Sequence, residues 1–228
     1  MPTRKTPLVS GEYYHVFNRT QNKEPAFTSK KDCERVIKTI GYYFYQNPPM
    51  RLSYFLQLGV DRRDEVISKM GRSQKIVDII SYCLMPNHFH LLLKQVTDDG
   101  ISNFLSLLQN SLTKYRNTKY KREGHLFQGR FKAVYIEDDV QLLHLSRYIH
   151  LNPYASSVVR TIEELANYPY SSLREYLRME DGFCTREIIE ANFKTTADYR
   201  KFVFDHADYQ KRLHKIKHLT LDVDSPSV

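Results

Sequence analysis

The sequence predicts an α+β fold of the ferredoxin-like type, in which an antiparallel sheet carries helices on one face and a helical extension follows at the C-terminus. Strand-like and helix-like segments alternate in the order strand, helix, strand, insert, strand, strand, helix, strand, helix. The two strongest strands, 75–85 and 88–96, are separated only by Pro86 and Asn87, which indicates a hairpin and antiparallel pairing. With 41% hydrophobic residues in 228, the chain can bury a core.

The first third of the chain supplies a strand and a helix. Aromatic and β-branched residues crowd the segment 12–19, which predicts the first strand. Apolar residues recur at near-helical spacing over 32–46, and the Asn-Pro-Pro at 47–49 indicates where this helix ends. The segment 51–60 is a candidate strand, and the charged stretch 61–73 predicts a short helix and a loop.

The later part of the chain is mainly helical in pattern. A long amphipathic helix is predicted over 100–124, and a strand over 130–137. The segment 138–153 predicts a helix with an acidic start and with Pro153 just past its end. The remainder, 154–228, is polar, without repeats and helical in pattern.

Charge and cysteine content restrict the function classes. Lys and Arg number 34 against 26 for Asp and Glu, a formal charge of +8, which favours nucleic acid over a membrane surface as partner. The three cysteines are scattered, which argues against a disulfide framework and a cysteine zinc site. The N-terminus lacks a signal-peptide pattern and no run of apolar residues is long enough to span a membrane, so we expect a cytoplasmic protein.

Two histidines stand at the start of the apolar run HFHLLLKQ. Side chains alternate along a strand, so His88 and His90 share one face while Phe89 points to the other. Two imidazoles at that separation can bind one divalent metal, although a third ligand must then come from elsewhere. The alternative is a polar, half-exposed strand end with two unrelated histidines.

The helix LSRYIHLNP offers the missing groups. Tyr148 and Asn152 lie four residues apart and therefore on one helix face. One interpretation places a nucleophilic phenol and a metal-binding amide opposite the histidines. The other makes Tyr148 a packed aromatic in a core stripe and Asn152 a cap before Pro153. Spacing does not choose between them.

Four motifs together resemble one family. They are YHVFNR (14–19), SYCLMPNHFHLLLK (81–94), GHLFQGRFKAVYIEDD (124–139) and RYIHLNPYAS (147–156). In order and approximate spacing they resemble the REP-associated tyrosine transposases, within the single-tyrosine HUH transposase superfamily. YPYSSLREYL (168–177) is similar to the segment that follows in that family.

The resemblance implies a role for each site residue. His88 and His90 match the metal-binding pair, Tyr148 matches the nucleophile, and Asn152 matches the polar residue of the metal shell, often glutamine in relatives. The implied activity is that of a metal-dependent single-stranded DNA transposase or endonuclease, with Mg²⁺ or Mn²⁺ as cofactor. It would cleave and rejoin hairpin-bearing DNA through a 5′-phosphotyrosine intermediate with a free 3′-OH. Tyrosine suits this chemistry because the aryl oxide can leave again, which keeps the link reversible.

The resemblance also implies a domain organisation and a substrate. Residues 1–155 would form the catalytic domain, with 52–74 as an insertion, and 156–228 a helical extension of unassigned function. The family's substrates are single-stranded DNAs that fold into imperfect hairpins near repeated extragenic palindromes. The sequence leaves open whether the chain acts as a monomer or a homodimer.

Two other residues compete for roles. Tyr115, on the basic helix, is the main rival nucleophile, although its neighbours suggest DNA contact instead. His15, on the first strand, is expected to be a core residue or an outer partner of the site, not a ligand.

A basic segment predicts a DNA-binding surface. Over 114–132, seven cations face one acid, Glu123, so the local charge is seven minus one, or +6. Aromatic residues are interleaved, as suits phosphate contacts with base stacking. The predicted DNA-binding residues are Lys114, Arg116, Lys119, Lys121, Arg122, Arg130 and Lys132. A merely solvated helix face is the alternative, and KRLHKIKH (211–218) either adds affinity or is a solvated tail.

Two further function classes remain open at this point. The same basic face would suit a domesticated hairpin DNA- or RNA-binding protein without useful turnover. The histidines alone would suit a metal phosphoesterase in which Tyr148 merely packs.

Overall fold

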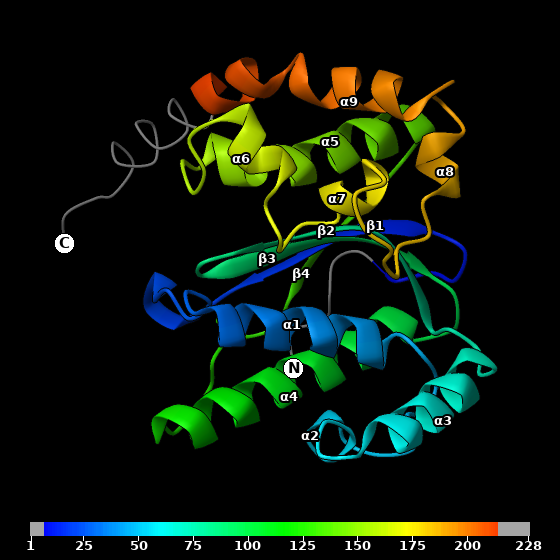
Figure 1. Cartoon of the computed structure of the whole chain (residues 1–228), viewed down its shortest axis with the longest axis vertical. Helices are drawn as coiled ribbons and strands as arrows, with labels where there is room; N and C mark the ends of the chain where they lie inside the picture. Colours follow the sequence, from blue (N-terminus) through cyan, green and yellow to red (C-terminus); the bar gives the residue numbers. More distant parts are fainter. Residues whose placement is uncertain (1–6, 214–228) are drawn as a thin grey trace.

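A four-stranded antiparallel sheet forms the centre of the computed structural model, which describes residues 7–213 (Figure 1). The strand order is β2-β3-β1-β4. The strands are β1 (Tyr13–Arg19), β2 (Val77–Met85), β3 (His88–Gln95) and β4 (Lys132–Tyr135). Helix α1 (Lys30–Tyr43) connects β1 to β2, and α4 (Gly100–Tyr120) connects β3 to β4. This is the β-α-β-β-α-β pattern of ferredoxin-like folds, so the predicted fold class is confirmed.

Helices cover both faces of the sheet, which differs from the expectation of one covered face. α1 and α4 pack on one side and α5 (Asp139–Ala155) on the other (Figure 1). Phe89, Leu91 and Leu93 join the core on the α1 side, whereas Leu92 joins the core on the α5 side. A strand that is apolar on both faces must be covered on both.

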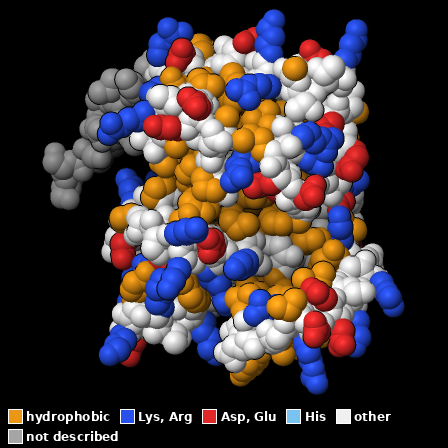
Figure 2. Space-filling model, in the orientation of Figure 1, with side chains coloured by type: hydrophobic (Ala, Val, Ile, Leu, Met, Phe, Trp, Pro, Cys, Tyr) orange, Lys and Arg blue, Asp and Glu red, His pale blue; other side chains and the backbone are white. Residues whose placement is uncertain are grey.

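The candidate strand at 51–60 is wrong. This part of the chain forms α2 (Leu52–Phe55) and leads into α3 (Val60–Gly71). Leu52 and Phe55 are three residues apart, a helical spacing, and both are buried. The backbone N–H of Leu52 donates to the hydroxyl of Tyr43, which attaches α2 to α1. The surface of α3 is mixed: it carries charged side chains (Figure 2) and also the exposed Val60 and Ile67.

The predicted end of the helix before Pro153 is also wrong, because α5 continues to Ala155 with Pro153 inside it. A proline in the last turn removes only one intrahelical bond, to the carbonyl of Ile149. The side-chain amide of Asn152 donates to the carbonyl of Tyr148 (3.1 Å), which adds a bond to this end of the helix. Asn152 is therefore a residue of the helix and not its cap.

The C-terminal extension is helical, as the sequence predicts; its last helix lies on the outer side of α5, whereas residues 170–172 hydrogen-bond the edge strand β2 (Figure 1). Its helices are α6 (Ile162–Ala166), α7 (Leu173–Tyr176), α8 (Glu187–Glu190) and α9 (Thr196–Phe204). The buried imidazole of His150 in α5 lies 2.7 Å from the Tyr199 hydroxyl and 2.8 Å from the Ser172 hydroxyl, so it joins α5 to the extension. Of the basic tail 211–218, residues 214–218 lie outside the described part. Within residues 7–213, no helix has the length and apolar character needed to cross a membrane.

Candidate active site

His88 and His90 are neighbours on the α5 side of the sheet. Their ring centroids are 5.0 Å apart, as the alternation along β3 requires. In the register of β1 with β3, Phe17 is opposite His90 and Arg19 is opposite His88. Paired residues of adjacent strands share a face, so β1 adds an aromatic ring and a cation beside the histidines.

Each histidine has a hydrogen-bond partner at Nδ1. The Nδ1 of His90 lies 2.9 Å from the Nε2 of His15, and the Nδ1 of His88 lies 2.6 Å from the Oδ1 of Asn87. Metal-binding histidines are typically held in this way by their other ring nitrogen, which makes Nε2 the candidate ligand atom in both. His15 is therefore an outer partner of His90 by geometry.

Burial keeps the imidazole rings of His90 and His15 neutral. Loss of solvent lowers the pKa of His90 well below its ordinary value, and the nearby His15 and His88 lower it further. Burial likewise lowers the pKa of His15 to about 4. Neutral imidazole is the form that binds a metal ion.

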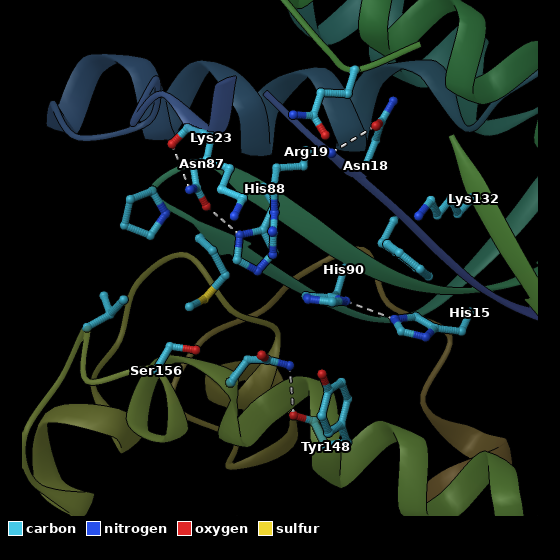
Figure 3. Close-up of a pocket in the computed structure, with 16 residues that line it drawn as sticks. His15, Asn18, Arg19, Lys23, Asn87, His88, His90, Lys132, Tyr148 and Ser156 are labelled. Carbon is cyan, nitrogen blue, oxygen red and sulfur yellow. Dashed lines mark hydrogen bonds between the residues drawn. The ribbon is translucent and has the colours of Figure 1, made fainter. Parts of the chain in front are cut away.

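Tyr148 and Asn152 face the histidines from α5 across a pocket. The Tyr148 ring centroid is 5.9 Å from that of His90 and 6.2 Å from that of His15, both edge to face. Figure 3 shows the Tyr148 side chain extending from its helix towards His90 on the opposite wall. Asn152 is buried and lines the same pocket, with its amide nitrogen bound to the Tyr148 carbonyl. The amide oxygen is its candidate ligand atom.

The pocket is basic. It encloses about 660 Å³ and is lined by the cations Arg19, Lys23 and Lys132, with no Asp or Glu among the described residues of its wall. Lys132 of β4 is opposite Phe17 in register, which brings it to the face that carries the histidines. A pocket of this charge suits a phosphodiester. The sequence analysis did not identify Arg19 and Lys23 as site residues. The alternation of β1 places Arg19 on the face of His15, but the pairing of β1 with β3, which brings Arg19 opposite His88, could not be inferred from the sequence.

The other predicted DNA-binding residues are dispersed. Arg116 is buried, and with Lys119 it forms ion pairs with Asp32, at 3.4 and 2.8 Å. Arg122 pairs with Glu24 at 3.1 Å. Three more lie away from the histidines, on other parts of the surface: Lys114, Lys121 and Arg130. Of the seven, Lys132 alone lines the pocket.

Several polar side chains bind the carboxylate of Asp32 on the α1–α4 side of the sheet. The hydroxyl of Tyr115 donates to its carboxylate at 2.9 Å and that of Tyr120 at 2.6 Å. Burial alone would raise the pKa of Asp32, but hydrogen bonds from Lys119, Ser29 and the two tyrosines outweigh it and hold the pKa far below the ordinary value. Tyr115 is thus engaged on the α1–α4 face, while the histidines lie on the α5 face.

We expect Asp32→Asn to lower the free energy of unfolding by about 3 kcal/mol at pH 7, because the substitution leaves the buried Arg116 unpaired. The pKa of Asp32 is depressed in the folded state, so its stabilising effect is full above the ordinary Asp pKa of about 4 and decreases as the pH falls below it. Urea unfolding at several pH values from below about pH 4 to pH 7 measures both the loss of stability and its dependence on pH. Glu34→Gln, which removes only an exposed pair with Lys30, is the control. A pH-independent difference would contradict the assignment.

The donor set fits a divalent metal. Within residues 7–213 no group of three His, Cys, Asp or Glu side chains is placed to hold an ion, so a zinc-type site of such ligands is not formed. Two imidazoles with one amide oxygen form a mixed set that leaves coordination positions for phosphate oxygens. His88, His90 and Asn152 are the residues that could supply it.

Comparison with known proteins shows which family this chain resembles. Residues 48–152, a segment that contains both histidines, Tyr148 and Asn152, match the family model described as "Transposase IS200 like". This segment, which is slightly less than half of the chain, is similar to the IS200-like transposases. A REP-associated tyrosine transposase of Haemophilus influenzae is 26% identical over 113 residues, which cover 45% of this chain and 62% of the relative, less than two thirds of its length.

The fold has a solved counterpart among transposases. A REP-associated tyrosine transposase bound to a REP hairpin aligns with a TM-score of 0.53 at 15% identity, covering 78% of this chain and 86% of that one. At this identity the likeness concerns the fold. The predicted resemblance of this chain to the REP-associated tyrosine transposases is confirmed.

Proposed function

We propose that the chain is a metal-dependent transposase that cleaves and rejoins single-stranded, hairpin-bearing DNA through a 5′-phosphotyrosine link at Tyr148. One observation carries the proposal: Tyr148 faces His90 at 5.9 Å across a pocket with three cations and no described carboxylate. The family supports it, as does the REP hairpin bound by the structural relative. We propose the cytoplasm as the compartment of this activity, as expected from the sequence.

Different residues of the pocket bind the phosphate and the metal ion. Arg19, Lys23 and Lys132 bind and orient the scissile phosphate by charge. His88 and His90 through Nε2, with the amide oxygen of Asn152, would hold Mg²⁺ or Mn²⁺. A bound ion supplies Lewis-acid stabilisation of the charge on the non-bridging phosphate oxygens.

Tyr148 carries the covalent step. Its hydroxyl loses a proton and attacks phosphorus, so that the Oη–P bond forms while the bond from phosphorus to the 3′ oxygen breaks. The departing 3′ oxygen takes up a proton and becomes a free 3′-OH. Attack of a 3′-OH on the phosphotyrosine reverses the step and joins DNA without ATP. His15 holds His90 in place: if Nε2 of His90 binds the ion, its Nδ1 bears the proton and donates to Nε2 of His15.

The test is a covalent adduct. With a hairpin DNA that carries a single-stranded 5′ tail, and with Mg²⁺ or Mn²⁺, a protein–DNA species that resists denaturant is expected. Peptide mass spectrometry after nuclease treatment should place the nucleotide on Tyr148. Binding without cleavage would instead support a DNA-binding protein, and an adduct at Tyr115 would contradict the assignment of the nucleophile.

A further inference from the structure

A second basic groove lies on the face of the sheet opposite the candidate active site. It encloses about 550 Å³ between α1, α2 and α4. Four cations line it, and no Asp or Glu does among the described residues: Arg35, Arg51, Lys114 and Lys119. Figure 2 shows Lys and Arg side chains over the lower half of this view, where these helices lie.

Three of these charges have no counter-ion within residues 7–213. Lys119 is paired with Asp32, but Arg35, Arg51 and Lys114 form no ion pair in that part of the chain. The guanidinium of Arg35 lies over the ring of Tyr115 at 5.1 Å, and its Nε is buried without a hydrogen-bond partner. Burial lowers the pKa of Arg35, so the site favours an added negative charge.

The segment predicted as an insertion forms one wall of this groove. Ser53 and Gln57 line it from α2 and the residues just after, opposite Asn110 and Ser111 of α4. Serine hydroxyls and side-chain amides next to arginine and lysine are the usual partners of phosphate oxygens. The hydroxyl of Tyr115 is already bound to Asp32, and its ring lies under Arg35. The groove therefore suits contacts with phosphate groups better than stacking of bases on Tyr115.

The groove and the active-site pocket are within reach of one DNA molecule. Pro86 lines the pocket, and its carbonyl accepts from the N–H of Phe27, just before α1 begins. Arg35 follows Ser29, the N-cap of α1, by six residues, about 9 Å along a helix. One turn of duplex is about 34 Å long, so a hairpin stem can extend from the pocket to the groove.

We propose that this groove binds the phosphodiester backbone of the DNA substrate at a point remote from the cut. The inference rests on the proposed function, since the ligand is the same DNA. It gives the segment 52–74 a role as the wall of a second DNA contact.

The test compares two double variants of equal charge. Arg51→Gln with Lys114→Gln removes two groove cations, and Arg62→Gln with Lys69→Gln removes two exposed cations of α3 outside it. A fluorescein-labelled 12-base-pair hairpin of arbitrary sequence with a ten-nucleotide 5′ tail is the probe, titrated by anisotropy at several KCl concentrations. We expect the groove variant to bind about tenfold more weakly. The slope of the logarithm of its binding constant against the logarithm of the KCl concentration should decrease in magnitude by about 1.8, at about 0.9 for each lost contact. The control should match wild type.

Adduct formation separates this inference from the proposed function. At saturating DNA the groove variant should form the Tyr148 adduct at the wild-type rate, because the groove lies across the sheet from Tyr148. A groove variant that binds like its control overturns the inference even if wild type forms the adduct. Loss of binding in the groove variant supports it even if wild type forms none. Displacement of the hairpin by micromolar decaglutamate would overturn it in favour of an acidic protein partner.

Discussion

Replacing Tyr148 with phenylalanine is expected to abolish the covalent adduct and to reduce DNA cleavage by at least about 10⁴-fold, with DNA affinity within about twofold of wild type. The substitution removes one oxygen and keeps the ring, so the edge-to-face contacts with His15 and His90 remain. The cations of the pocket are untouched and continue to bind phosphate. A denaturing gel with labelled DNA measures cleavage, and anisotropy measures binding.

Tyr115→Phe is the matched control. Tyr115 donates its hydroxyl to Asp32 on the other face of the sheet, so this variant should keep the adduct and lose only part of the stability of the α1–α4 contact, on the order of 1 kcal/mol. Cleavage that survives in Tyr148→Phe would support the phosphoesterase alternative, in which the histidines act and the phenol packs.

The fold was predictable where its signals are local. The apolar runs 75–85 and 88–96, with only two residues between them, predict the hairpin of β2 and β3, and the spacing of apolar residues predicts α1, α4 and α5. The covering of both faces is visible in the run Leu91 to Leu93, which leaves no polar side for the strand. The segment 51–60 was mistaken for a strand because a short apolar run does not distinguish a strand from a buried helical turn.

The site was predictable only in part, because its members come together through tertiary packing. Periodicity alone places His88 beside His90, whereas Arg19 reaches them through a strand pairing more than sixty residues apart in sequence. The buried Asp32 pairs with Arg116 and Lys119, so two cations that resemble a DNA-binding stripe in sequence stabilise the contact of α1 with α4 instead. A charge count along a helix does not reveal a partner from another helix.

The second large effect is expected at His90. His90→Ala should weaken Mn²⁺ binding in the absence of DNA by at least about 100-fold and reduce cleavage to background, since it removes a candidate ligand from the wall of the pocket. Titration calorimetry or Mn²⁺ spin resonance measures the affinity, and thermal unfolding shows whether the variant is folded. Unchanged Mn²⁺ affinity in a folded variant would contradict the assignment of His90.

Two substitutions of His15 test whether its hydrogen bond to Nδ1 of His90 positions the His90 ring for metal binding. His15→Ala should weaken Mn²⁺ binding by about 10- to 100-fold, the usual cost of losing an outer hydrogen bond to a metal-binding histidine. His15→Gln should recover part of this loss, because the amide oxygen can accept from Nδ1 of His90. A loss of stability without a change in affinity, equal in both variants, would make His15 a packing residue.

Mixing two inactive variants tests whether the pocket is complete within one chain. Tyr148 lies on α5, which packs on β2 and β3 of the same chain and is joined by His150 to the helices of the extension. Because α5 is held on both sides, we expect Tyr148→Phe mixed with His90→Ala to remain inactive in adduct formation. Recovery of activity in the mixture would require α5 of one chain to serve the histidines of another, and α5 would then have to leave the core formed by Ile149 and Leu92.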